Sequence, residues 1–201
     1  STAVSLLKIT QSRLMEKTFA ELPDHWLVID LEATCCNDGQ FPREEMEIIE
    51  IGAVIVDGKT FRSVDEFQMF VRPHRHTTLT DFCRKLTGIE QAVVDSAVGF
   101  PEALCRLTDW KAGFADAVFC SWGEYDHRQF ERDCELHDVA WPFGDRHVNL
   151  KKCYTDRFSL KRGEGFGHAL GKHNLTFEGR PHRGIDDARN IVRMLPIIFE
   201  Q

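Results

Sequence analysis

The chain has 201 residues, 42% of them hydrophobic and 28% charged, which is typical of one soluble globular domain. A formal net charge of −7 excludes a protein that coats nucleic acid through general electrostatics, because neutralising many phosphates takes a basic surface, but it leaves room for an enzyme that grips a strand end. No run approaches the roughly 20 apolar residues that cross a bilayer, and the N-terminus lacks a signal-peptide pattern. The seven cysteines are scattered and lack the Cys-x-x-Cys spacing of zinc or redox sites. We therefore expect a cytoplasmic protein without membrane contacts.

Short apolar runs and helical patterns predict an α/β fold. Residues 1–24 carry a short helical pattern, so we expect an accessory helix or linker before a single domain over 25–201. Apolar runs at 26–31, 47–56 and 67–71 predict three strands, and the Asp57-Gly58 turn makes the last two antiparallel neighbours. In chain order there follow predicted helices near 81–86, 90–94 and 100–110, a strand at 117–122, a helix at 124–137, a strand at 147–150, and helices at 151–160, 166–172 and 184–199. This order indicates a mixed five-stranded sheet with helices on both faces.

Two acidic residues close the first predicted strand. Asp30 and Glu32 flank Leu31 and, because strand side chains alternate between faces, project from the same side of the sheet. Two carboxylates so close together repel each other in a low-dielectric setting unless a cation lies between them. Taken alone, however, an Asp-x-Glu pair more often marks two solvated acids in a loop.

Asp126 lies where the predicted strand at 117–122 gives way to a helix. It shares a helix face with Phe130 and Cys134, which must pack on the sheet, so its carboxylate is aimed toward the sheet edge rather than at water. The helix dipole also favours an acid at this end. The ordinary alternative is an acid that only stabilises the helix N-terminus, of which Glu124 is the more typical example.

The last predicted helix begins with a third acidic site. Asp187 shares an apolar stripe with Ile191, Met194 and Ile198, and His182 precedes it in a loop. There an imidazole can reach a water near the Asp187 carboxylate, and histidine suits proton abstraction because its ordinary pKa of about 6.5 lies close to working pH. A surface histidine beside a helix cap is the alternative. All three acidic sites lie where a strand ends or a helix begins, which is where ligands collect in open α/β sheets, and their combination makes coincidence improbable.

In this order, Asp30-x-Glu32, Asp126 and His182-x-x-x-x-Asp187 resemble the pattern of the DEDDh 3′-to-5′ exonucleases of the ribonuclease-H-like superfamily. Longer stretches resemble more closely the Eri-type exoribonucleases, at 29–35, 47–50, 82–89, 121–130 and 179–182. Some members of the family carry a further nucleic-acid-binding domain before the nuclease. The residues before Trp26 leave no room for one, so we do not expect specificity for RNA structure of that kind.

The resemblance implies a site and a mechanism. Two Mg²⁺ or Mn²⁺ ions would be held by Asp30, Glu32, Asp126 and Asp187, with Asp30 bridging both, and His182 would act as general base. RNA would be hydrolysed from its 3′ end to nucleoside 5′-monophosphates, with single strands or 3′ overhangs as substrates. The terminal nucleotide would lie near Ala33, Thr34, Leu86, Thr87 and Trp122. Glu50 is not among the ligands of the family, and we expect it to have a local hydrogen-bonding or edge-strand role.

Other functions remain open at this stage. A DNA-directed or dual-specificity proofreading or repair exonuclease would use the same acids identically. A non-catalytic module that binds the 3′ end of a strand is a second alternative, although a pure binder has no need to hold repelling carboxylates together. A nucleotide-binding redox protein is excluded because no Gly-x-Gly-x-x-Gly turn follows the first strand.

Overall fold

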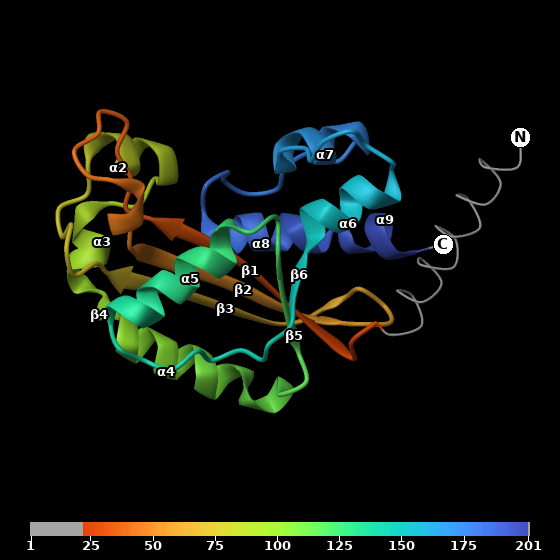
Figure 1. The fold of residues 1–201 in the computed structure, drawn as a ribbon, viewed down its shortest axis with the longest axis horizontal. Helices are drawn as coiled ribbons and strands as arrows, with labels where there is room; N and C mark the ends of the chain where they lie inside the picture. The colour runs from red at the N-terminus through yellow and green to blue at the C-terminus, as the bar shows by residue number, and fades with distance from the viewer. Residues whose placement is uncertain (1–21, 201) are drawn as a thin grey trace, which may run out of the picture.

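The computed structural model describes residues 22–200, so most of the accessory helix or linker predicted for residues 1–24 lies outside the described part. Its centre is a six-stranded sheet in the order β4-β3-β2-β1-β5-β6 (Figure 1). The strands are β1 (His25–Ala33), β2 (Ile48–Asp57), β3 (Ser63–Arg72), β4 (Val98–Gly99), β5 (Val118–Ser121) and β6 (His147–Asn149). The α-helices are α2 (Asp81–Thr87), α3 (Gln91–Ser96), α4 (Phe100–Lys111), α5 (Tyr125–Leu136), α6 (Leu150–Arg157), α7 (Phe166–Lys172), α8 (Gly184–Val192) and α9 (Leu195–Phe199), and short 3₁₀ turns form at η1 (Arg43–Glu45) and η2 (Ala112–Phe114).

The sheet is mixed, as predicted, but it has one strand more than the predicted five. β1 and β2 are antiparallel, β2 and β3 form the predicted antiparallel hairpin, and β5 and β6 continue the sheet in parallel from β1. The additional strand, β4, contributes only Val98 and Gly99, which pair in parallel with β3. Two residues are too few to show a strand pattern in the sequence, so the prediction of five strands missed it.

Helices cover both faces of the sheet, as predicted. Alternate residues of β1 belong to two hydrophobic cores, one on each face of the sheet. On one face, Leu27 and Ile29 pack with Phe100 and Phe130 from α4 and α5. Val28, between them, packs in the cluster formed by α6, α7, α8 and α9. Figure 1 shows α4 and α5 on one side of the strands and α8 and α9 on the other. Asp30 and Glu32 have the parity of Val28 and therefore project toward the α8 side.

The prediction of one continuous helix over 184–199 is wrong, because the structure divides this segment into α8 and α9. Pro196 stands in the first turn of α9. Proline has no N–H to donate to the carbonyl of Val192, so the ladder of helical hydrogen bonds is interrupted there. Met194, at the break, is nevertheless fully buried, and the predicted apolar stripe still faces the core.

A contact between two glycines sets the position of α8 on the sheet. A Cβ atom added to Gly52 in β2 would lie 2.1 Å from the carbonyl carbon of Gly184, and one added to Gly184 would lie 2.8 Å from the carbonyl oxygen of Asp30. The first turn of α8 therefore rests directly on the backbone of β1 and β2, which only glycine allows. Asp187, in this turn, is thereby brought to the end of β1.

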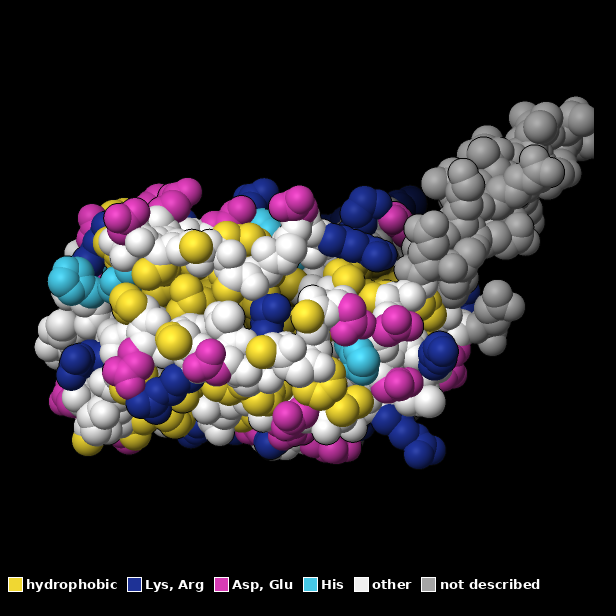
Figure 2. Space-filling view, turned by 90° about the horizontal axis from the view of Figure 1, so that it is seen from below, with side chains coloured by type: hydrophobic (Ala, Val, Ile, Leu, Met, Phe, Trp, Pro, Cys, Tyr) yellow, Lys and Arg dark blue, Asp and Glu magenta, His cyan; other side chains and the backbone are white. Residues whose placement is uncertain are grey.

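One face of the molecule carries charges of both signs. Figure 2 shows one face on which basic and acidic side chains are interspersed around a band of hydrophobic ones, without a continuous basic tract. Within residues 22–200, each helix is too short or too polar to cross a membrane.

Candidate active site

Three carboxylates meet at the end of β1. Asp30 and Glu32 project from the same side of the strand, and Asp187 reaches them from the first turn of α8, so that one oxygen of each lies within 4.8 Å of the others. Asp126 and His182 line the same cavity, which has a volume of about 300 Å³. The structure therefore brings together all five residues that the sequence analysis placed at the site.

Asp126 reaches the cavity from the first turn of α5, where it is only 5% exposed. Its Oδ1 accepts a hydrogen bond from the backbone N–H of Leu31 at 3.1 Å. This bond ties the N-terminus of α5 to β1 between the two acids of the strand. Phe130 and Cys134 are buried along the same helix face, as the spacing predicted, and they hold α5 on the sheet.

The carboxylates raise the pKa values of one another. Burial raises the pKa of Asp30 well above its usual value, and the charges of Asp126 and Asp187 raise it further. Burial, together with the charge of Asp187, raises the pKa of Glu32 to about 9. Burial also raises the pKa of Asp126 to about 7 and that of Asp187 to about 6, although backbone N–H donors partly offset this effect. Acids that resist ionisation together in this way call for a cation to compensate their charge.

A buried acid anchors the segment before α8. Glu50 is fully buried in β2, and its Oε2 accepts hydrogen bonds from Arg183 Nε at 3.0 Å and from the backbone N–H of Gly184 at 3.2 Å. Gln68 Nε2 donates to its other oxygen at 2.6 Å. The predicted hydrogen-bonding role of Glu50 is confirmed. The edge-strand alternative is wrong, because β2 lies between β1 and β3.

His182 stands next to this anchor in a left-handed backbone conformation, with φ of 61°. Few residues other than glycine adopt this conformation, so the surrounding contacts must impose it. The N–H of Arg183 donates to Asp187 Oδ2 at 3.1 Å, and the N–H of Asp187 donates back to the Arg183 carbonyl at 2.9 Å. These reciprocal bonds fix the turn at His182 relative to the Asp187 carboxylate.

The five residues predicted near the terminal nucleotide divide into two groups. Ala33, Leu86 and Trp122 line the cavity. Thr34 and Thr87 are buried behind it, where their hydroxyl groups accept hydrogen bonds from the backbone N–H groups of Glu47 at 3.0 Å and Ile89 at 3.1 Å. Both threonines therefore support the backbone near the cavity rather than line it.

Other lining residues were missed by the sequence analysis, namely Cys35, Met46, Tyr125 and Phe166. The position of Tyr125, immediately before Asp126, could have been a signal, because the first turn of that helix was already placed at the site. Met46 and Phe166 gave no such signal. Each lies far along the chain from the acids and reaches the cavity only through the tertiary fold.

The donor set suits a hard divalent cation. Asp30, Glu32 and Asp187 offer only carboxylate oxygens, which are the ligands that Mg²⁺ and Mn²⁺ prefer. Burial and the charges of the neighbouring acids raise the pKa values of Asp30 and Glu32, and a cation between them would offset both effects. The residues of this cluster therefore fit a divalent metal.

Known proteins resemble the chain over most of its length. The family model described as exonuclease, RNase T, matches residues 27–195. The human 3′-5′ exoribonuclease 1 is 35% identical over an alignment of 191 residues, which covers 90% of this chain and 54% of the human protein. The human ERI1 exoribonuclease 2 is 32% identical over 192 residues, which cover 85% of this chain and 28% of that protein. The chain thus spans about half or less of the length of these curated relatives.

Two solved structures share the fold. The nuclease domain of 3′hExo, described as a DEDDh family member bound to rAMP, has a TM-score of 0.81 and 34% identity, covering 89% of this chain and 94% of that one. A structure of a 3′-exonuclease in 3′-end-specific recognition of histone mRNA stem-loop has a TM-score of 0.83 and 31% identity, covering 96% and 70%. These likenesses confirm the ribonuclease-H-like fold and the resemblance inferred from the sequence. The chain therefore belongs to the exonuclease family, in its DEDDh branch.

Proposed function

We propose that the chain is a 3′-to-5′ exoribonuclease that releases nucleoside 5′-monophosphates and works with two Mg²⁺ or Mn²⁺ ions. The observation that carries this proposal is the convergence of Asp30, Glu32 and Asp187 within 4.8 Å, in a cavity that Asp126 and His182 also line. Unpaired buried carboxylates destabilise a fold when nothing compensates them, so their juxtaposition is better explained by a function that uses cations.

The four acids divide the task of holding the metal. Asp30, whose pKa is raised by the charges of all three other acids, would contact both cations, while Glu32 and Asp187 would complete one site and Asp126 would support the other. When bound, the cations polarise the scissile phosphate and make a coordinated water more acidic. The protein contributes the fixed spacing, through the backbone contact between α8 and the sheet.

His182 would accept the proton of the attacking water on its imidazole ring. The bonds between Arg183 and Asp187 fix the turn that carries it, which holds the backbone of His182 close to the Asp187 carboxylate. The charge of His182 lowers the pKa of the Asp187 carboxyl, so the two side chains are close enough to interact.

The terminal nucleotide would lie against Ala33, Leu86 and Trp122. The indole of Trp122 is held by a hydrogen bond from its Nε1 to the Glu164 carbonyl at 3.1 Å and by edge contact with Phe166 at 5.2 Å between ring centroids. A fixed aromatic wall binds a base at little entropic cost. Thr34 and Thr87 would contribute indirectly, by holding the backbone behind this wall.

RNA is proposed as the substrate because the similar curated proteins are named exoribonucleases. Single strands and 3′ overhangs are proposed as the substrates, because both leave the terminal nucleotide unpaired and free to enter the cavity. The acids themselves do not distinguish RNA from DNA. Sensitivity to the 2′-hydroxyl does, so parallel digestion of RNA and DNA of the same sequence separates the two substrates.

The test is hydrolysis of an end-labelled oligoribonucleotide by the wild type and by Asp187→Ala and His182→Ala, with Asp145→Ala, an exposed acid away from the cavity, as control. Both site variants should lose most of the activity, EDTA should abolish it in the wild type, and the control should retain it. Full activity in either site variant would overturn the assigned roles. Equal rates on DNA would favour the dual-specificity alternative, and tight binding without turnover would favour the 3′-end-binding module.

A further inference from the structure

The loop that carries His182 is attached at both ends to the first turn of α8. At its start, the N–H of Arg180 donates to Asp186 Oδ2 at 2.9 Å. At its end, the N–H of Arg183 donates to Asp187 Oδ2 at 3.1 Å, and the N–H of Asp187 donates to the Arg183 carbonyl at 2.9 Å. The backbone is therefore tied to the helix on both sides of His182.

The Arg183 side chain attaches the same loop to the sheet. Its Nε donates to Glu50 Oε2 at 3.0 Å, and the N–H of Gly184 donates to the same oxygen at 3.2 Å. Gln68 Nε2 donates to the other oxygen of Glu50 at 2.6 Å. The Arg183 guanidinium carbon also lies 5.2 Å from the centroid of the Phe70 ring, which is a cation–π contact. Arg183 thus joins the loop to two strands, β2 and β3.

Glu50, the partner of Arg183, lies beside the acidic cluster. It pairs with Glu32 across β1 and β2, and residues so paired point to the same face of a sheet. In addition to burial, the charge of Glu50 raises the pKa values of Asp30 and Glu32. The ion pair with Arg183 offsets this charge. Removal of Arg183 alone would therefore change both the attachment of the loop and the repulsion within the cluster.

The backbone of His182 needs such an attachment. Its φ of 61° is left-handed, and a residue with a Cβ atom keeps this conformation only where the surrounding contacts impose it. Arg183 and Gly184 follow directly, and their bonds to Glu50 hold the chain on this side of the histidine. Without them, the loop could relax to a conformation that is ordinary for histidine.

We propose that Arg183 is a positioning residue, whose bond to Glu50 holds His182 in the left-handed conformation that directs its imidazole into the cavity with the acids. The proposal rests on the exonuclease activity and the general-base role proposed above. The Arg183 side chain is engaged with Glu50 and Phe70 and does not line the cavity, so it acts through His182 and not on the substrate.

The test is a double-mutant cycle between Arg183 and His182, with an end-labelled oligoribonucleotide as substrate. Arg183→Ala should lower kcat about 100-fold, which is the effect of displacing a catalytic group by about 1 Å, and should leave KM almost unchanged. In the His182→Ala background the same change should lower kcat no further, because the residue through which it acts is already absent. Losses that multiply in full, or a loss confined to KM, would refute the positioning role.

A second variant separates the position of His182 from the charge of Glu50. Glu50→Gln combined with Arg183→Ala removes both charges, so no unpaired carboxylate is left buried beside Glu32. This variant should fold and should still show the loss in kcat. If it regains the activity of the wild type, the repulsion within the cluster caused the loss, and the proposal is wrong.

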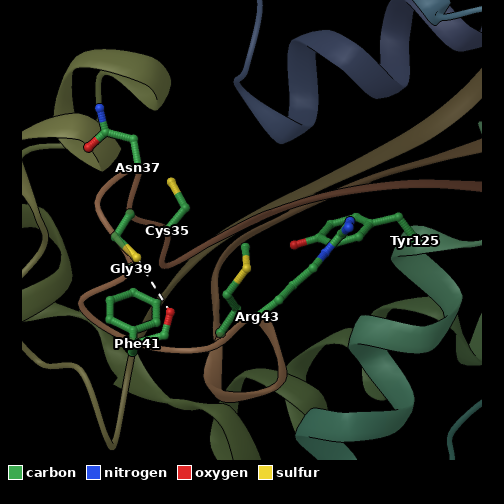
Figure 3. Close-up of a pocket in the computed structure, with 8 residues that line it drawn as sticks. Cys35, Asn37, Gly39, Phe41, Arg43 and Tyr125 are labelled. Carbon is green, nitrogen blue, oxygen red and sulfur yellow. Dashed lines mark hydrogen bonds between the residues drawn. The ribbon is translucent and has the colours of Figure 1, made fainter.

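Arg43 provides the matched control, because it is an arginine beside the same cavity on a different segment, η1. Figure 3 shows its side chain extended toward the Tyr125 ring on α5, and its guanidinium carbon lies 5.3 Å from the ring centroid. Tyr125 also lines the cavity with the acids. Arg43→Ala should change kcat by the same factor in the wild type and in His182→Ala. A factor that disappears in His182→Ala would show that the loss of any nearby arginine couples to His182, which contradicts a specific role of Arg183.

Crystal structures of the wild type and of Arg183→Ala test the position of the ring without metal, substrate or turnover. The wild type should keep the left-handed φ at His182, whereas the variant should lose it and turn the imidazole out of the cavity. An unchanged His182 in the variant would overturn the proposal. A wild type that leaves every oligonucleotide intact would instead contradict the proposed function, and the two structures would still decide whether Arg183 positions His182.

Discussion

One end of the central sheet buries two different kinds of acidic residue. Glu47, Glu50 and Asp133 accept hydrogen bonds from neighbouring N–H groups; Asp133, for example, accepts from Ile48 N at 3.1 Å and from Gln129 Nε2 at 2.6 Å. Asp30 and Glu32, only a short distance away, receive no hydrogen bond on their side chains from the described part of the chain. Acids of the first kind hold loops and strands in place. Acids of the second kind are held together against their own repulsion, which agrees with the metal-binding role proposed for them above.

The largest expected effect is the loss of activity in Asp30→Asn, a change of an acid of the second kind. This change removes one charge from the repelling cluster, so hydrolysis should fall by about 10³-fold or more, since a bound metal supplies several kcal/mol to such reactions. The same change should leave the melting temperature in EDTA unchanged or raise it. Reaction rates and thermal unfolding of one sample measure both effects. If Asp30→Asn loses activity because it unfolds, then Asp30 stabilises the fold as the acids of the first kind do, and the distinction between the two kinds is wrong.

Glu47→Ala should show the opposite behaviour. Three backbone N–H groups of the loop at 74–76 would lose their acceptor, and we expect the free energy of unfolding in urea to fall by about 3 kcal/mol. Glu44→Ala, at an exposed position of η1, is the matched control and should cost less than about 0.5 kcal/mol. Equal stability of the two variants would show that water replaces the lost carboxylate at no cost.

Metal addition should act on one kind of acid only. Mg²⁺ or Mn²⁺ at about 100 times its dissociation constant should stabilise the wild type by about 2.7 kcal/mol, because the folded state binds it and the unfolded chain does not. Asp30→Asn should lose this gain, whereas Asp133→Asn should keep it. Thermal unfolding with and without the metal checks the prediction, and a gain retained by Asp30→Asn would place the metal elsewhere.

A pH dependence of stability is expected at Asp133. Burial raises the pKa of this carboxyl from 3.8 to about 7 in the folded protein, so between these values the folded state binds more protons than the unfolded chain. The free energy of unfolding should therefore fall as the pH rises from 4 to 7, by up to about 1.4 kcal/mol per unit from this group. Asp133→Asn should reduce the slope by that amount. An unchanged slope in urea titrations across this range would contradict it.

Much of the site was predictable because its residues lie at the ends of strands and helices whose apolar residues recur with a clear period. The alternation along β1 placed Asp30 and Glu32 on one side, and the helical spacing of Asp126 with Phe130 aimed this acid at the sheet, where both lie. Such arguments depend only on local geometry. They therefore hold without knowledge of the packing.

The features that escaped prediction depend on contacts between distant segments. The contact of Gly52 with Gly184 and the cavity walls at Met46 and Phe166 arise only when separate elements pack. The break before α9 carries a local signal, Pro196, but the apolar stripe continues through it and suggested one helix. The period of the apolar residues shows which face of a helix is buried. It does not show whether the backbone hydrogen bonds continue without a break along that helix.

The glycine contact beneath α8 also determines which substitutions can retune the metal site. Backbone atoms meet backbone atoms at Gly52 and Gly184, so a change of rotamer in the core cannot move the backbone of Asp187 relative to that of Asp30. Trimming a core side chain further along the helix, such as Ile191, would weaken the protein while leaving its choice of metal ion as it is. Directed evolution toward a larger cation would instead have to begin with the carboxylates themselves.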